Sequence, residues 1–72
     1  MFLISEESKL RFYILNQGSV VKEEFFTIQQ LKNYHQKQWK ICQGDYQRFV
    51  NECLAAWSAN FEGWNVGTFD IV

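Results

Sequence analysis

No proline occurs in the sequence, and the four glycines are scattered singly along its 72 residues. A chain without Pro-rich or Gly-rich stretches and without internal repeats shows no sign of a linker, so we expect a single domain over residues 1–72. Isolated glycines also exclude a phosphate-binding loop. Two cysteines, Cys42 and Cys53, are too few for a disulfide framework. We expect both thiols to be free and reduced, although a bridge is geometrically possible if their helices are antiparallel neighbours.

An excess of charge of either sign is also missing, since seven basic side chains face eight acidic ones and the net charge is −1. No global field therefore attracts nucleic acid or a membrane, and any such binding must be local. No apolar run approaches the roughly 18 residues of a membrane span, and the uncharged residues 1–4 are too short for a secretory signal. We expect a soluble, cytoplasmic protein that does not bind membranes.

Groupings of catalytic or metal-binding residues are scarce. His35 is the only histidine, so any acid–base, triad or metal scheme must be built around it. No nucleophile or carboxylate pattern points to His35, and the spacing to Cys42 and Cys53 matches no paired-ligand motif. Adjacent Glu23 and Glu24 would face opposite sides of a strand, so they cannot act as a catalytic pair. The sequence therefore predicts a non-enzymatic protein without metal or cofactor.

Aromatic side chains, by contrast, are abundant, with seven Phe, three Trp and three Tyr. A chain this short buries only about 60% of its unfolded surface, so its core needs bulky residues. The clearest pattern lies between residues 45 and 57, where one apolar stripe at helical spacing is formed by Tyr46, Phe49, Val50, Cys53, Leu54 and Trp57. This stripe predicts a helix with Asp45 as N-cap and Asn60 as its left-handed C-terminal cap.

The N-terminal half has the pattern of a hairpin followed by a helix. Residues 9–15 and 20–26 alternate as strands around a turn in which Gly18 takes a positive φ. Thr27 and Gln30 form a capping-box pattern that predicts a helix over residues 28–41, closed by Gly44 in the left-handed region. On this helix His35 would share the apolar face.

Residues 64–72 complete the predicted architecture as a last strand, with a bulge at Gly67. The predicted fold is therefore α+β: an N-terminal antiparallel hairpin or meander, two consecutive helices packed on one face of it, and a C-terminal strand that joins the sheet. The order of elements is ββααβ.

Such a sheet can bury only one face against two helices, yet the hairpin carries apolar residues on both. The expected uncovered set is Tyr13, Leu15, Val20 and Phe26, to which Phe61 and Trp64 could add. We therefore predict a protein-interaction or regulatory module, a homodimer that pairs through its apolar sheet face or an edge strand. An N-terminal arm that folds back over this face is the alternative that stays open.

A second hypothesis is binding of single-stranded nucleic acid by the first predicted helix and the start of the second, through Lys32, Tyr34, Lys37, Lys40 and Arg48. Lysines interleaved with aromatic residues suit backbone contact and base stacking. The geometry weakens this hypothesis, because the three lysines spread over about 140° of a helical wheel and Trp39 turns toward the core.

Overall fold

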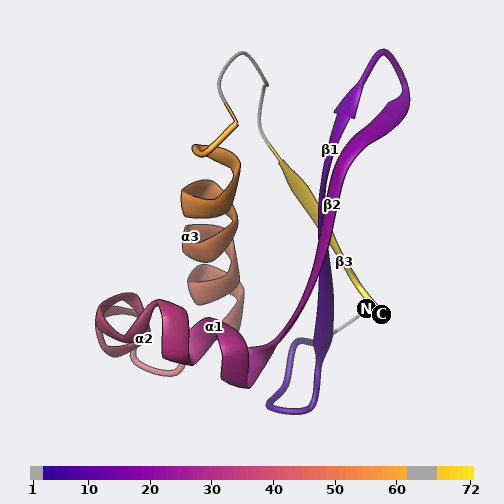
Figure 1. Cartoon of the computed structure of the whole chain (residues 1–72). Coiled ribbons are helices and arrows are strands. Elements are labelled where there is room, and N and C mark those ends of the chain that lie inside the picture. Colours follow the sequence, from indigo (N-terminus) through magenta and orange to yellow (C-terminus); the bar gives the residue numbers. More distant parts are fainter. Residues whose placement is uncertain (1–2, 62–66) are drawn as a thin grey trace.

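The computed structural model describes residues 3–61 and 67–72. The described elements are β1 (Lys9–Asn16), β2 (Ser19–Thr27), α1 (Ile28–Tyr34), α2 (Gln36–Cys42), α3 (Tyr46–Ser58) and β3 (Thr68–Ile71). The strands form one antiparallel sheet in the order β2-β1-β3, so the C-terminal strand joins the hairpin as predicted. In Figure 1 the helices stand together on one side of this sheet. The α+β class and the order of elements are thus confirmed.

The hairpin turn follows from two residues that accept positive φ. Gln17 has φ 53° and Gly18 has φ 80°, which is the two-residue primed turn whose twist matches that of paired strands. The register then shifts between Ile14 and Leu15: Ile14 is opposite Lys22, whereas Leu15 is opposite Val20. Val21 is therefore the extra residue of a β-bulge in β2.

Gly67 was predicted to form a bulge within a strand, but β3 begins only at Thr68. The glycine fits here for another reason, because an added Cβ would lie 3.3 Å from side-chain carbons of both Leu54 and Ser58 on α3, closer than most Cβ contacts. Residues 64–66 of the predicted strand fall outside the described residues.

The prediction of one helix over residues 28–41 is wrong, because His35 interrupts it. Its backbone (φ −130°, ψ 51°) lies outside the helical region and separates α1 from α2. The His35 N–H donates to the Leu31 carbonyl at 2.9 Å, and the His35 carbonyl accepts from the Trp39 N–H at 3.0 Å. The break redirects the chain so that Trp39 packs on Tyr46 and Phe49, with ring centroids 5.3 and 5.0 Å away.

The predicted helix starts are confirmed. Thr27 and Gln30 form the complete capping box of α1, with bonds of 3.1 and 2.9 Å. Gly44 has φ 85°, and the Asp45 carboxylate accepts from the Arg48 N–H at 3.1 Å to cap α3. The left-handed cap predicted at Asn60 is wrong, because α3 ends with Ala59 in the right-handed region and Asn60 does not have a positive φ.

The core lies between the sheet and the helices, with Phe12 at its centre. The Phe12 ring is fully buried, with centroid distances of 5.2 Å to Phe26, 5.7 Å to Trp57 and 6.4 Å to Phe69. The remaining buried hydrophobic residues are Leu10, Ile14, Ile28, Leu31, Cys42, Phe49, Val50, Cys53 and Leu54. The indole of Trp57 also donates to the Glu24 carboxylate at 3.1 Å. The Phe12 ring thus connects all three strands to α3.

We expect Phe12→Ala to lower the free energy of unfolding by about 3–5 kcal/mol, because the truncation leaves a cavity at the centre of the core. That loss is comparable with the whole stability of a domain this small. The control is Ile41→Ala, since Ile41 is 50% exposed on α2 and should cost less than about 1 kcal/mol. Urea unfolding followed by circular dichroism measures both. Similar losses in the two variants would show that Phe12 is not the centre of the core.

Candidate functional site

The sheet has one face that the described helices do not cover, and we call it the outer face. Strand alternation places Lys9, Arg11, Tyr13 and Leu15 of β1 on it, opposite the buried Leu10, Phe12 and Ile14. The register adds residues opposite these, namely Val20, Glu23 and Phe25 of β2 and Asp70 of β3. Val21 also belongs here, because it directly precedes Lys22, and Lys22 is paired with Ile14 of the inner face.

Four of these residues form what we call the apolar stripe: Leu15, Val20, Val21 and Phe25. Their side chains are between 37% and 48% exposed. Three of them gather at the turn end of the hairpin, where the bulge brings Val20 and Val21 to the same face as Leu15. Exposed apolar side chains that gather on one face are typical of protein contact sites.

A charged cluster centred on Arg11 interrupts the stripe. The Arg11 guanidinium donates to Glu23 at 3.0 Å and to Asp70 at 3.3 Å, and it lies 4.2 Å from the centroid of the Tyr13 ring. The Tyr13 hydroxyl donates to the other oxygen of Asp70 at 3.4 Å. The bond to Glu23 is the main cause of the raised pKa of Arg11. The cluster connects all three strands and holds its charges in fixed positions beside apolar side chains.

The edge of β2 is the second open feature of the sheet. Within the described part of the chain, β2 pairs with β1 alone, so the backbone groups of its other edge have no strand partner. Lys22, Glu23 and Glu24 occupy the middle of this edge. Charged side chains on an edge strand discourage nonspecific pairing with other strands.

Three of the six residues predicted to lie at an interface are on the outer face: Tyr13, Leu15 and Val20. Phe26 lies instead in the core, because it is opposite Leu10 on the inner face. Phe61 is half-buried against Trp57, with ring centroids 5.0 Å apart. Trp64 lies outside the described residues.

Sequence reasoning missed Phe25 and Val21. Simple alternation placed these two residues on the side opposite Val20 and Phe26. The bulge brings Val20 to the same face as Phe25 and Val21. Phe25 stands next to Lys9, whose amine lies 5.6 Å from the ring centroid. The sequence signal that could have identified Phe25 lies in β1. Arg11 is polar and therefore marks the outer face, and Phe25 is opposite Arg11.

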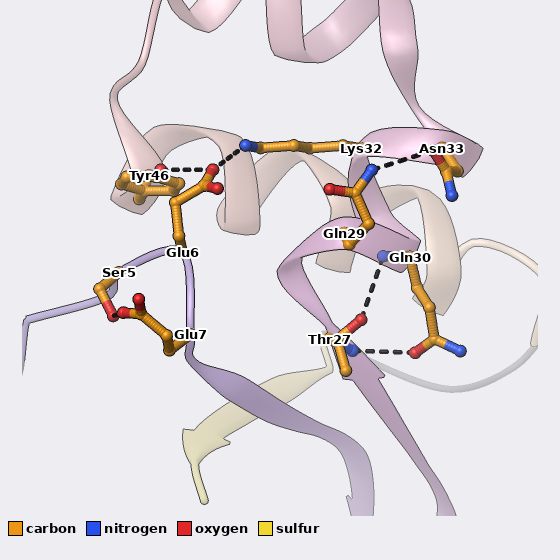
Figure 2. A network of polar contacts seen from close by, with 9 residues as sticks. All are labelled: Ser5, Glu6, Glu7, Thr27, Gln29, Gln30, Lys32, Asn33 and Tyr46. Atoms are coloured by element: carbon orange, nitrogen blue, oxygen red, sulfur yellow. Dashed lines mark hydrogen bonds and ion pairs between the residues drawn. The ribbon is translucent and has the colours of Figure 1, made fainter.

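Lys32, the first of the predicted nucleic-acid contacts, is engaged within the fold (Figure 2). Its amine pairs with the Glu6 carboxylate, whose same oxygen accepts from the Tyr46 hydroxyl at 2.9 Å. The amine also lies 4.3 Å from the centroid of the Trp39 ring. We call this group, Glu6, Lys32, Trp39 and Tyr46, the Glu6 junction. It connects the segment before β1 to all three described helices.

The other predicted contacts lie on separate helices. Tyr34 is 64% exposed at the end of α1 and meets the Phe26 ring edge-on at 6.2 Å. Lys37 and Lys40 are exposed on α2, and Arg48 is exposed on the first turn of α3. Within residues 3–61 and 67–72 the ion pairs are formed by Arg11 and Lys32, so these three cations have no acidic partner there.

A small hollow of about 160 Å³ opens between the sheet and the helices. Its walls are mainly aromatic and apolar, formed by Phe12, Phe26, Leu31, Tyr34, His35, Cys53, Ala56, Trp57 and Asn60. A hollow of this size has room for about one six-membered ring. Burial raises the pKa of the Cys53 thiol to about 12, so this sulfur is protonated and a poor nucleophile at neutral pH. His35 at the rim has no carboxylate among the lining residues to act with it.

The described residues contain no group of three or more metal-binding side chains. None of their helices combines the length and the apolar character that crossing a bilayer requires. The candidate site in the described structure is therefore the outer face together with the edge of β2.

The Glu6 junction gives a prediction about pH. Hydrogen bonds from Lys32 and then Tyr46 lower the pKa of Glu6 below its ordinary value. The stabilisation by this carboxylate is then complete above the ordinary pKa of a glutamate, about 4.3, and is lost as the pH falls through the lowered pKa. We expect Glu6→Gln to reduce stability at neutral pH and to flatten the acid limb of the stability curve.

The matched control is Glu7→Gln, because among the described residues Glu7 accepts a hydrogen bond from the Ser5 hydroxyl alone, at 3.4 Å. Urea midpoints between pH 2 and pH 7 measure the difference. An acid limb that is as steep in Glu6→Gln as in the unmodified chain would contradict a stabilising role for the junction.

Comparison with known proteins adds no further guide to this site. No family model, no curated protein and no solved structure matches the chain.

Proposed function

We propose that this chain is a non-enzymatic protein-interaction module of regulatory or accessory type that acts as a homodimer. The contact is made by the outer face or by the edge of β2. The observation that carries this proposal is the apolar stripe, whose four large side chains are roughly half exposed on a rigid sheet.

The energetics favour burial of this stripe by a partner. Apolar surface removed from water contributes about 25 cal/mol per Å², and the inner face already supplies the core that the monomer needs. Because the stripe lies on paired strands, little conformational entropy is lost when a partner binds it. The stripe is therefore a preorganised contact surface.

The Arg11 cluster supports specificity. Charges held between three strands suit a partner with complementary groups in one orientation and disfavour others. A second copy of the chain offers the same apolar side chains and the same charges, and isologous contacts of this kind are the commonest in oligomers.

The first test is the solution mass over a concentration series by sedimentation. We expect the mass to approach twice the 8.6 kDa of the chain. Phe25→Ser should raise the dissociation constant at least about fivefold, since loss of an aromatic contact costs more than roughly 1 kcal/mol. Ile41→Ser is the control, because it removes an equally exposed apolar side chain from α2. A chain that stays monomeric throughout, or equal effects of the two variants, would contradict the proposal.

The second candidate function is binding of single-stranded nucleic acid through Tyr34, Lys37, Lys40 and Arg48. It is favoured by one observation: the three cations have no acidic partner in the described residues, while the Tyr34 ring is exposed. Lys32 is not among the contacts of this candidate, because its amine is paired with Glu6.

For this candidate we expect Lys37→Glu to weaken binding of a mixed oligonucleotide at low salt, equally for every sequence, and to reduce the salt dependence of the affinity. Lys9→Glu, on the opposite side of the sheet from the helices, is the control with the same change of charge. Fluorescence anisotropy measures the affinities. Undetectable binding of the unmodified chain at low salt would eliminate this function.

A further inference from the structure

The open edge of β2 is the longest edge that the described sheet presents. β2 has nine residues, whereas β3 at the opposite edge has four. A second antiparallel strand on β2 would satisfy the free backbone groups along most of its length. We propose that this strand is β2 of a second copy, related by a twofold axis that is normal to the sheet and passes at Glu23. This inference rests on the proposed self-association and assigns it to the edge of β2, where Val21 and Phe25 are the stripe residues that meet the second copy.

The charges on β2 distinguish the possible registers. An axis at Lys22 would place Lys22 opposite its own copy, and an axis at Glu24 would do the same for Glu24. Like charges directly opposite one another destabilise paired strands. With the axis at Glu23, Lys22 of each copy is instead opposite Glu24 of the other, which makes two pairs of opposite charge.

The apolar residues agree with this register. With the axis at Glu23, Val21 of each copy is opposite Phe25 of the other, and both belong to the apolar stripe. An axis normal to the sheet keeps the two outer faces on the same side, so the two stripes become continuous. An axis in the plane of the sheet would place the stripe of one copy beside the helix-covered face of the other, and the apolar side chains would not meet.

The one like-charged contact in this arrangement is Glu23 against Glu23 of the second copy. Arg11 of the same chain offsets the charge of each of these carboxylates, because its guanidinium donates to Glu23 at 3.0 Å. Glu24 keeps its acceptor role as well: one oxygen accepts from the Trp57 indole at 3.1 Å, and the second can accept from Lys22 of the other copy.

The same three charges explain why the occupant is a second copy and not an arbitrary strand. Lys22, Glu23 and Glu24 would lie opposite uncharged or like-charged groups on most strands, which is unfavourable. β2 itself supplies the complementary charges in one register. The charges on this edge thus disfavour pairing with most strands and favour pairing with β2 of a second copy.

The experiment uses Glu23→Cys under oxidised glutathione, because residue 23 lies opposite itself only in the proposed register. Paired strands bring opposing Cα atoms within the range that a disulfide spans, so we expect most of the chain to become a covalent dimer. Lys22→Cys is the matched control: its neighbour across the axis is Glu24, so it should remain uncrosslinked. The native Cys42 and Cys53 are buried, and the unmodified chain should give no covalent dimer.

A second variant keeps the test independent of disulfide formation and of the folding of the cysteine variants. Lys22→Glu would place one acidic side chain opposite each Glu24, in two pairs across the axis, and should raise the dissociation constant about tenfold. Lys37→Glu makes the same change of charge on α2 and should leave it unchanged.

The outcomes separate this inference from the proposed function. A dimeric mass with no covalent dimer from Glu23→Cys, or with covalent dimer from Lys22→Cys instead, would overturn the register and leave self-association intact. Equal effects of Lys22→Glu and Lys37→Glu would overturn it as well. A monomeric mass for the unmodified chain would overturn both.

Discussion

The packing of Phe12 against Phe26, Trp57 and Phe69 is the contact on which both layers of this fold depend. It requires the inner side chains of all three strands to face α3 at once, which fixes the register of the sheet. A one-residue slip would exchange the two faces and expose Phe12. Because the chain has one layer of described helices, the face opposite Phe12 is left without a cover in that part of the structure.

The outer face is therefore a consequence of how the core is built. The bulge at Val21 increases its apolar area, since it turns Val20 to the same side as Leu15. The Arg11 cluster then fixes the strands to one another through ion pairs that cross from β2 to β3. Exposed ion pairs of this kind contribute little to stability, so their more important effect is to hold charges in one arrangement beside the stripe.

Local chemistry in the sequence was enough to predict most of the fold. The hairpin turn at Gly18, the capping box of Thr27 and Gln30, and the cap at Asp45 each depend on interactions within a few residues. The break at His35 was not predictable in this way, because residues on both sides of it favour helix. It arises from tertiary packing, in which Trp39 must reach Tyr46 and Phe49.

The candidate site was predicted less well for the same reason. Tyr13, Leu15 and Val20 were identified from alternation, but Phe26 was chosen where Phe25 is exposed, since the sequence shows apolar residues in both phases and does not show the bulge. In the Glu6 junction, Lys32 and Tyr46 lie 26 and 40 positions from Glu6 in the sequence. No local sequence pattern predicts contacts over such separations. Without knowledge of this contact, the sequence grouped Lys32 with Lys37 and Lys40.

The two polar networks have different consequences for binding. The Glu6 junction pairs Lys32 beside an aromatic ring among the helices, and so removes one cation from the surface that nucleic acid could use. The Arg11 cluster leaves Glu23 and Asp70 on the open face, where any partner would have to match them. Fixed charges among exposed apolar side chains select a partner more than they strengthen its binding. Lys22, Glu23 and Glu24 lie in sequence on the longest open edge of the described sheet, so the same kind of selection would act on any strand that pairs there.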